Sequence, residues 1–396
     1  MRDQAPLAVA GQRMDIADFK IERYFARWEF AVPYVLGASD VEGYRLQDML
    51  ALADEDGGKL WEALTLGYTQ SEGHPALRSE IANLYHHIDP HEILVCSPVE
   101  AIFLFVHAAL GAGDHAIVVW PAYQALYEAA RSTKADVTLL PLHPETGWTL
   151  ELGALTAALR PTTRAIVINF PHNPTGAMID ARTFGAIVAI AKEAGVWLFS
   201  DEMYRFLEFD PSGRLPAGAD AYERGVSLGG MSKSFAMGGL RIGWLATHDR
   251  DLLARIARLK DYTSICCSAP SEILAIIALR ARERVLSRSR EIVFRNLDRL
   301  DRFFGEWPEC FTWVRPRGGS VAFPALRTDW PADAFAAKLA EQEGVLIVPG
   351  SIFECPGNHF RVGLGRSNLP EALERVERFI QGRDPSRRAG SFAPSL

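Results

Sequence analysis

Residues 165–204 read AIVINFPHNPTGAMIDARTFGAIVAIAKEAGVWLFSDEMY, and this stretch decides the fold class. Two short, unbroken apolar runs, 165–169 and 196–200, lie on either side of a segment with helical spacing, 181–194. Unbroken apolar runs of this length predict strands that are buried on both faces of a sheet. Strands of this kind that are separated by a helix lie parallel with a right-handed crossover, so the stretch predicts an α/β fold.

The same alternation of apolar runs and helical spacing continues on both sides of this stretch, up to about residue 284. It predicts a mainly parallel sheet of seven strands with helices on its faces. The predicted strands are 93–96, 116–120, 136–140, 165–169, 196–200, 225–229 and 242–247. The predicted helices are 16–28, 45–55, 75–87, 98–110, 123–132, 181–194, 250–261 and 270–283.

After residue 284 strands and helices no longer alternate strictly, which is typical of an α+β domain. The 396 residues also exceed the roughly 250–300 at which one core stops growing, so two unequal domains are expected. A long charged helix (282–304) is followed by predicted strands 311–314, 320–323, 345–348 and 360–363 and helices 331–343 and 370–380. We expect a large domain over 46–284, a small domain over 285–382, an N-terminal segment (1–45) packed on the small domain, and a disordered tail (383–396).

Composition and charge exclude several classes of protein. Lys and Arg total 42 against 49 Asp and Glu, and a net charge of -7 does not favour a nucleic-acid partner. The most apolar run, 101–112, is shorter than the ~20 residues that a membrane-spanning helix needs. Five cysteines without C-x-x-C spacing fit reduced thiols, and the first residues lack a sustained apolar run. We expect a cytoplasmic protein without a membrane partner.

Polar side chains follow three of the predicted strands. Ligands of an open parallel sheet bind beyond the carboxyl ends of its strands, so these segments hold the candidate site residues. The segments are FPHNPTG (170–176) after strand 165–169, DEMY (201–204) after strand 196–200, and GMSKSFAMGGLR (230–241) after strand 225–229.

Five chemically distinct side chains therefore meet at one edge of the sheet: an amide, a carboxylate, a phenol, an amine and a guanidinium. An amine can form an imine with an aldehyde, and a carboxylate can face a ring nitrogen. An amide can bind a phenolic oxygen, and a guanidinium can bind a phosphate. Together they are the groups that pyridoxal phosphate needs. The side chains are those of Asn173, Asp201, Tyr204, Lys233 and Arg241.

In the order and spacing of these motifs, residues 15–382 resemble the fold-type I pyridoxal-phosphate enzymes, specifically the class I and II aminotransferases. The resemblance implies three catalytic residues. Lys233 would form the Schiff base with the cofactor, and Asp201 would pair with its pyridinium nitrogen. Tyr204, together with Asn173, would contact the hydroxyl oxygen of its ring.

The resemblance also implies further cofactor contacts and a homodimer. Tyr123, in WPAY, would stack on the ring, and Tyr68 would reach the phosphate of the partner subunit. Arg241 would bind the phosphate of its own subunit. The remaining cofactor contacts would come from Ser97, Pro98 and Val99, in CSPVEA, and from Ser232, next to Lys233.

For the substrate, the resemblance implies that Arg361, in HFRVGL, grips the carboxylate of an amino acid beside Asn173. The strip LGASDVE (36–42) contributes Gly37 and Asp40. With Glu42, Asp40 forms an acidic pair that can bind a cationic substrate side chain, or can simply face solvent.

The expected activity is the transfer of the amino group of an L-amino acid to a 2-oxo acid. The same chemistry also serves elimination, replacement and cyclisation. The strip 36–42 and the segment PRGGSVAFP (316–324) look like the capreomycidine-synthase branch, which cyclises a hydroxylated arginine. The substrate side chain stays open at this point. No metal site is expected, because the cluster YHHIDPHE (85–92) lies in a polar connector without a further ligand pattern.

Overall fold

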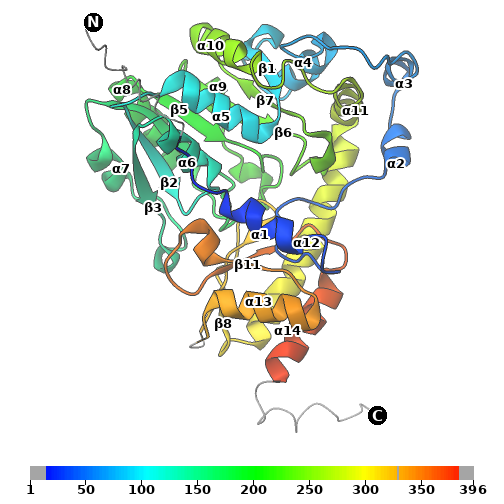
Figure 1. The fold of residues 1–396 in the computed structure, drawn as a ribbon, viewed down its shortest axis with the longest axis vertical. Helices are drawn as coiled ribbons and strands as arrows, with labels where there is room; N and C mark the ends of the chain where they lie inside the picture. The colour runs from blue at the N-terminus through cyan, green and yellow to red at the C-terminus, as the bar shows by residue number, and fades with distance from the viewer. Residues whose placement is uncertain (1–14, 328–329, 383–396) are drawn as a thin grey trace, which may run out of the picture.

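The structure is a computed structural model that describes residues 15–327 and 330–382. Its largest element is a seven-stranded sheet in the order β1-β7-β6-β5-β4-β2-β3 (Figure 1). Neighbouring strands are parallel except at β7, which runs antiparallel to both β1 and β6. The predicted fold class, a mainly parallel α/β sheet, is therefore confirmed. The strands are β1 (Ile93–Cys96), β2 (His115–Trp120), β3 (Asp136–Pro141), β4 (Thr163–Asn169), β5 (Trp197–Asp201), β6 (Gly225–Gly230) and β7 (Gly243–Ala246).

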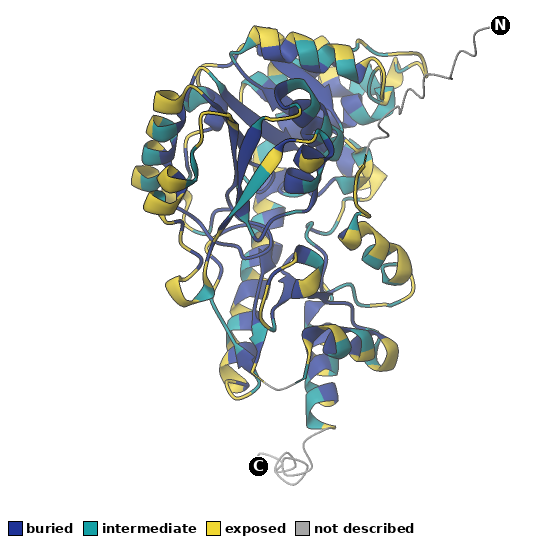
Figure 2. Cartoon of the chain, turned by 60° about the vertical axis from the view of Figure 1, so that its left-hand side comes forward, coloured by how far each residue is buried: buried dark blue, intermediate teal, exposed yellow. Residues whose placement is uncertain are grey.

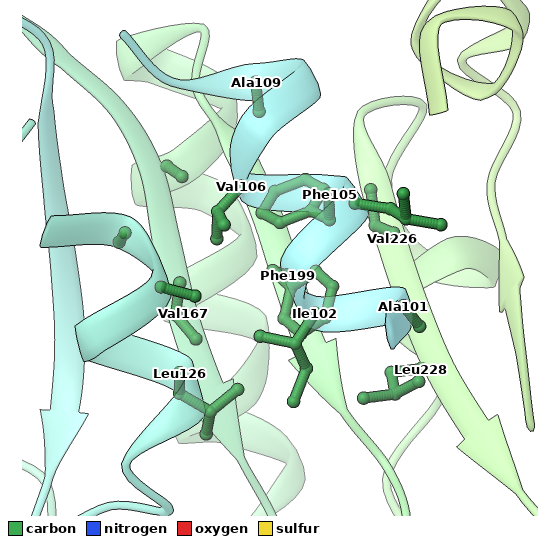
Figure 3. Close-up of a cluster of buried hydrophobic side chains, with 14 of the residues drawn as sticks. Ala101, Ile102, Phe105, Val106, Ala109, Leu126, Val167, Phe199, Val226 and Leu228 are labelled. Atoms are coloured by element: carbon green, nitrogen blue, oxygen red, sulfur yellow. The ribbon is translucent and has the colours of Figure 1, made fainter. Parts of the chain in front are cut away.

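Both faces of this sheet are buried, which explains why its strands are apolar without alternation. Val167 of β4 belongs to the same buried cluster as helices α5, α6 and α10, whereas Ile166 and Ile168 belong to the cluster of α8 on the other face. Figure 3 shows the first cluster, in which Phe105 of α5 and Phe199 of β5 lie 4.4 Å apart between ring centroids.

The helices of this part of the chain begin and end at residues suited to those positions. The side chain of Asp180 accepts a hydrogen bond from the Thr183 N–H at 2.7 Å, and Gly195 ends the same helix with a φ of +64°. The predicted helix 45–55 is wrong as one piece, because Asp54 caps a second helix by accepting from the Gly57 N–H at 2.6 Å. The helices are α1 (Lys20–Trp28), α2 (Leu46–Leu50), α3 (Glu55–Glu62), α4 (Pro75–Ala82), α5 (Pro98–Ala109), α6 (Ala125–Ser132), α7 (Leu152–Ala158), α8 (Ala181–Ala194), α9 (Gly218–Ala221), α10 (Arg250–Lys260) and α11 (Ala269–Arg280), with short 3-10 turns η1 (Pro90–Glu92), η2 (Pro144–Thr146), η3 (Pro211–Gly213) and η4 (Gly238–Leu240).

The C-terminal part contains two small sheets, ordered β10-β8 and β11-β12-β9, and three helices. Its longest helix, α12, joins the two parts of the chain: Val285 packs with α4 and α11, and Leu300 packs with α13 and α14. Because α12 crosses residue 284 near its own start, the domain boundary at that residue stays a prediction. The elements are α12 (Arg282–Glu306), β8 (Phe311–Thr312), β9 (Val321–Ala322), β10 (Ala325–Leu326), α13 (Ala332–Glu343), β11 (Val348–Pro349), η5 (Gly350–Phe353), β12 (Phe360–Gly363) and α14 (Leu369–Gln381).

Residues 34–42 cross the C-terminal part with a turn at Leu36 and Gly37, where the Ala38 N–H donates to the Val35 carbonyl at 3.2 Å. The Gly37 N–H donates to the Leu346 carbonyl and the Gly363 N–H donates to the Leu36 carbonyl, each at 2.6 Å. The contact is so close that a Cβ atom at Gly363 would lie 1.9 Å from the Ala38 carbonyl oxygen, so only glycine fits there. This path carries Ser39 and Asp40 toward the loop that follows β6.

Figure 2 shows the burial that results: most sheet strands are dark blue, the edge strand β3 is largely half-buried or exposed, and the outer faces of the helices are exposed. Across the two described ranges, no helix combines the length and apolar character needed to cross a membrane. The predicted tail 383–396 and the first fourteen residues of the N-terminal segment lie outside the described residues.

Candidate active site

Two adjoining cavities lie at the carboxyl edge of the sheet. The strand-end cavity, of about 470 Å³, is lined by Asn169, Asp201 and Leu228, which lie at or near the ends of β4, β5 and β6. The α1 cavity, of about 750 Å³, is lined by α1, by residues 38–49 and by the loop after β6. Residues common to both linings are Glu22, Ser39, Ser232, Lys233 and Arg241.

Lys233 lies between these cavities in the loop that follows β6. Its Nζ atom donates a hydrogen bond to Ser39 Oγ at 2.7 Å. Desolvation lowers the pKa of Lys233 to about 8, with Arg361 and Arg241 acting in the same direction and Asp40 opposing them. Such a lysine supplies far more neutral amine near pH 7 than an ordinary one, and the neutral amine is the form that attacks a carbonyl carbon.

Asp201 ends β5 and is buried in the strand-end cavity. Burial raises the pKa of its carboxyl to about 7, although the Met203 N–H donates to Oδ1 at 3.1 Å and favours the charged form. A cationic ligand atom facing this carboxylate would return it to its ionised form. The geometry therefore suits a protonated ring nitrogen.

A chain of hydrogen bonds connects the end of β4 to β12. The Asn169 side-chain amide donates to the Asp201 carbonyl at 2.9 Å, and its oxygen accepts from the Asn173 N–H at 2.8 Å. Asn173 Oδ1 in turn accepts from Arg361 Nη1 at 3.1 Å. Arg361 is only 1% exposed, and its Nε and Nη2 atoms both donate to the Gly37 carbonyl. Neither cavity is lined by Arg361 itself, which lies behind Asn173.

Two tyrosines line the strand-end cavity. Tyr204 is buried, and its hydroxyl lies near Ser39 without a hydrogen bond of normal geometry. Tyr123 follows β2, and its hydroxyl donates to Glu22 Oε1 at 3.4 Å. Desolvation raises the pKa of both phenols, so both are neutral at physiological pH.

The other end of the strand-end cavity can hold an anion. Arg241 is exposed, and its Nη2 atom donates to Ser97 Oγ at 3.2 Å just before the N-terminus of α5. The hydroxyl of Ser232 is buried and has no hydrogen-bond partner in the described structure. Pro98 and Val99, in the first turn of α5, line the same cavity. A phosphate here would gain a guanidinium, two hydroxyls and the positive end of a helix.

Three predicted site residues lie apart from this arrangement. Tyr68 is 90% exposed in the segment between α3 and α4 and lines neither cavity. The carbonyl of Gly37 accepts a hydrogen bond from Arg361 Nη2 at 2.9 Å. Asp40 lines the α1 cavity, but its Oδ1 atom already accepts from Arg366 Nη2 at 2.9 Å. Its predicted role toward a cationic substrate stays a prediction.

The structure also places residues in the site that the sequence reasoning missed. Asn169 is the first polar residue at the end of a predicted strand, which is the same signal that singled out Asp201. Ser39 and Glu22 come from the N-terminal segment, and nothing in their local sequence shows that they reach Lys233.

These residues fit pyridoxal phosphate. The unpartnered Ser232 hydroxyl, the exposed Arg241 guanidinium and the N-terminus of α5 form a phosphate site. The same cavity is lined by Asp201, whose carboxyl has a raised pKa, and by Lys233, whose amine has a lowered pKa. A sheet of this topology with such a site defines a fold-type I pyridoxal-phosphate enzyme.

The model of the family described as aminotransferase class I and II matches residues 53–376. The chain belongs to this family and is a pyridoxal-phosphate-dependent transferase. A capreomycidine synthase from Streptomyces vinaceus is 26% identical over 364 residues, covering 92% of this chain and 87% of that one. An arginine–pyruvate transaminase from Pseudomonas aeruginosa is 30% identical over 323 residues, covering 78% and 81%. A crystal structure of a PLP-dependent aminotransferase from Streptococcus suis superimposes with a TM-score of 0.88 at 31% identity, covering 94% and 99%.

Proposed function

We propose that this enzyme transfers the amino group of an L-amino acid to a 2-oxo acid. The observation that carries the proposal is the placement of Lys233 and Asp201 in one cavity, with a lowered pKa at the amine and a raised pKa at the carboxyl. Groups whose pKa values are perturbed by burial and that face one cavity are typical of a catalytic site.

Bound pyridoxal phosphate would supply an aldehyde carbon for the substrate nitrogen and a ring that accepts electrons from the substrate Cα. Asp201, as an anion, would favour a proton on the ring nitrogen. The Lys233 amine would take the proton from the substrate Cα as a general base and would deliver a proton to the former aldehyde carbon as a general acid. Ser39 holds the Lys233 amine between the two cavities.

The other side chains bind and orient. Arg241, Ser97 and Ser232 would hold the phosphate, with Pro98 and Val99 at the helix N-terminus. Tyr204 and Asn173 would bind the ring oxygen, and Tyr123 would pack on the ring. Arg361 binds the substrate carboxylate once the Asn173 side chain shares or yields its hydrogen bond.

We further propose a cytoplasmic homodimer in which Tyr68 reaches the phosphate site of the partner subunit. The exposed apolar side chains near Tyr68 in sequence and at the end of α10 support this, because large apolar side chains at 88–91% exposure are typical of a protein interface. These side chains are Leu66, Tyr68 and Tyr262.

A second candidate is the cyclisation of an arginine-like amino acid. The similarity to capreomycidine synthase supports it, because that similarity extends over 92% of the chain. The two reactions share the roles of Lys233 and Asp201 and differ in the product.

The test is borohydride reduction of the purified holoenzyme, followed by peptide mapping and product identification. The cofactor should be fixed on Lys233, and incubation with an amino acid and a 2-oxo acid should give the exchanged pair. Lys233→Ala should keep some bound cofactor and lose turnover. Attachment at another lysine would refute the site, and a cyclic product without a released oxo acid would select the second candidate.

A further inference from the structure

One face of α1 forms a wall of the α1 cavity. Glu22, Phe25 and Glu29 all line it, and their spacing of three and seven residues places them on one side of a helix. The two arginines of the same helix, Arg23 and Arg27, are exposed and line neither cavity. The wall therefore carries two carboxylates on the same face of the helix, about two turns apart, with the ring of Phe25 between them.

The position of Glu29 is electrostatically unfavourable. It is the residue that ends α1, where the helix dipole disfavours a negative charge. Burial raises the pKa of its carboxyl and the neighbouring Asp40 adds to the rise, while Arg366 and Lys233 oppose it in part. Within residues 15–327 and 330–382, no cationic side chain comes within ion-pair distance of Glu29 or Glu22. A cationic ligand beside Glu29 would offset these unfavourable effects on its negative charge.

The other charged groups of the cavity offset the charge of this wall only in part, because Arg366 and Lys233 favour the charged form of Glu29 without forming an ion pair with it. Asp40 pairs with Arg366. Lys233 and Arg241 face the cofactor aldehyde and phosphate in the proposed function. The ligand that fills the cavity thus meets two carboxylates without an ion-pair partner among the described residues; Glu22 accepts only the long hydrogen bond from Tyr123. Ser232, whose buried hydroxyl lines both cavities without a hydrogen-bond partner, also marks the place where the cavities meet as a space that a ligand enters.

We propose that Glu22 and Glu29 bind the cationic end of the substrate side chain, so that the amino-acid substrate carries a guanidinium or an ammonium group. The inference rests on the proposed function, because the substrate's other end is set by Arg361 and Lys233. In this proposal the cationic group is bound by the carboxylates of α1 and not by Asp40, which already has Arg366 as its partner.

The experiment compares cationic amino acids with neutral analogues of the same shape on the holoenzyme. The pairs are L-arginine with L-citrulline, and L-ornithine with L-norvaline. The change in cofactor absorbance gives kcat/KM for each, and the preferred pair distinguishes a guanidinium from an ammonium. We expect the cationic member of at least one pair to be favoured more than tenfold, as for a charge-assisted hydrogen bond.

Glu22→Gln and Glu29→Gln keep the shape of the wall and remove its charge. Each should lower kcat/KM for the cationic substrate about tenfold and change that for its neutral analogue less than twofold. Glu374→Gln, on the exposed face of α14, is the matched control and should change neither. A second readout without turnover is calorimetric binding of the same amino acids to Lys233→Ala, in which the preference for the cation should persist and should fall in Lys233→Ala/Glu29→Gln.

Equal kcat/KM for the cationic and neutral members of both pairs overturns the proposal. So does an equal loss for both members in the two glutamine variants. An enzyme that processes neutral amino acids normally would leave the proposed function standing and overturn this inference alone. An absence of any response to all amino acids, with cofactor bound, would overturn the proposed function and the inference with it.

Discussion

At the scale of single residues, the site holds two ionisable groups in their less common states. Lys233 is surrounded by protein that disfavours its ammonium, and Asp201 by protein that disfavours its carboxylate. Both effects arise mainly from burial, and each is reversed by what the cofactor would place next to the group. The cofactor-free protein should therefore show both perturbations directly.

The amine of Lys233 should capture the cofactor with an unusual pH dependence. Since the neutral amine is the nucleophile, the rate of attachment to cofactor-free protein should rise with pH through a midpoint near 8. Asp40→Asn should move the midpoint lower, because Asp40 favours the ammonium. Stopped-flow absorbance between pH 6 and 10.5 measures it. A midpoint near the ordinary value of 10.5 would contradict the environment described for Lys233.

Asp201 should reduce the stability of the cofactor-free protein above neutral pH. Its folded pKa of about 7 lies above its unfolded value of 3.8, so the folded state retains a proton that the unfolded state releases. The contribution of Asp201 to the free energy of unfolding is therefore greatest below pH 3.8 and is lost as the pH rises toward and through 7. Asp201→Asn removes this loss, so at pH 8 the variant without cofactor should be more stable by roughly 2–4 kcal/mol. Urea unfolding at pH 5 and 8 checks it; a wild type as stable as the variant at pH 8 would refute the assignment.

At the scale of elements, α12 is the longest helix and connects the two packed clusters. Leu300 is fully buried on its C-terminal half, whereas Asp298 is exposed on the same turn. Leu300→Ala should therefore lower the free energy of unfolding by about 2–5 kcal/mol, through lost burial and a residual cavity. Asp298→Ala should change it by less than ~0.5 kcal/mol. Similar losses for both variants in urea unfolding would show that this half of α12 is not packed as described.

The elements also show what the sequence can reveal. All seven strands of the large sheet were predictable within about two residues, because six of them are almost entirely buried and their apolar runs are unbroken. The edge strand β3 is largely half-buried or exposed but still carries an apolar run. The split between α2 and α3 was not, because it depends on one capping bond of Asp54. The predicted strand 345–348 is only partly correct: β11 covers Val348–Pro349, and Val345 makes a single bridge to Tyr34. A two-residue strand carries too few positions to show a pattern.

The site residues also divide into those that a local sequence pattern reveals and those that it does not. Lys233, Asp201 and Asn173 follow strands, and the topology rule alone brings them together. Ser39, Glu22 and Glu29 come from a segment whose path is set by partners more than 300 positions away in sequence, such as Leu346 and Gly363. No local pattern encodes such a long-range pairing, so these residues appear only in the folded structure.

At the scale of the whole molecule, the predicted dimer has a functional consequence that can be measured. Mixing Lys233→Ala with Tyr68→Ala subunits gives heterodimers in which one site has both an intact Lys233 and the partner's intact Tyr68. If Tyr68 acts across the interface, activity should return to about one quarter of that of wild type at equal mixing, since half of the dimers are mixed and each has one complete site. Each variant alone is the control. No recovery after subunit exchange, or full activity in a monomer, would contradict the shared site.

The pairing of residues 34–40 with residues 345–366 also sets an order of events during synthesis. The Gly37 N–H donates to the carbonyl of Leu346, 309 positions later in the sequence, and Asp40 pairs with Arg366, 326 positions later. At 5–20 residues per second the beginning of the chain waits roughly 15–60 s for its partners. During that time, the segments that bear Asp201 and Lys233 are made before the partners of residues 34–40. A chain that stopped before residue 346 would therefore lack the partners that hold Ser39 beside Lys233.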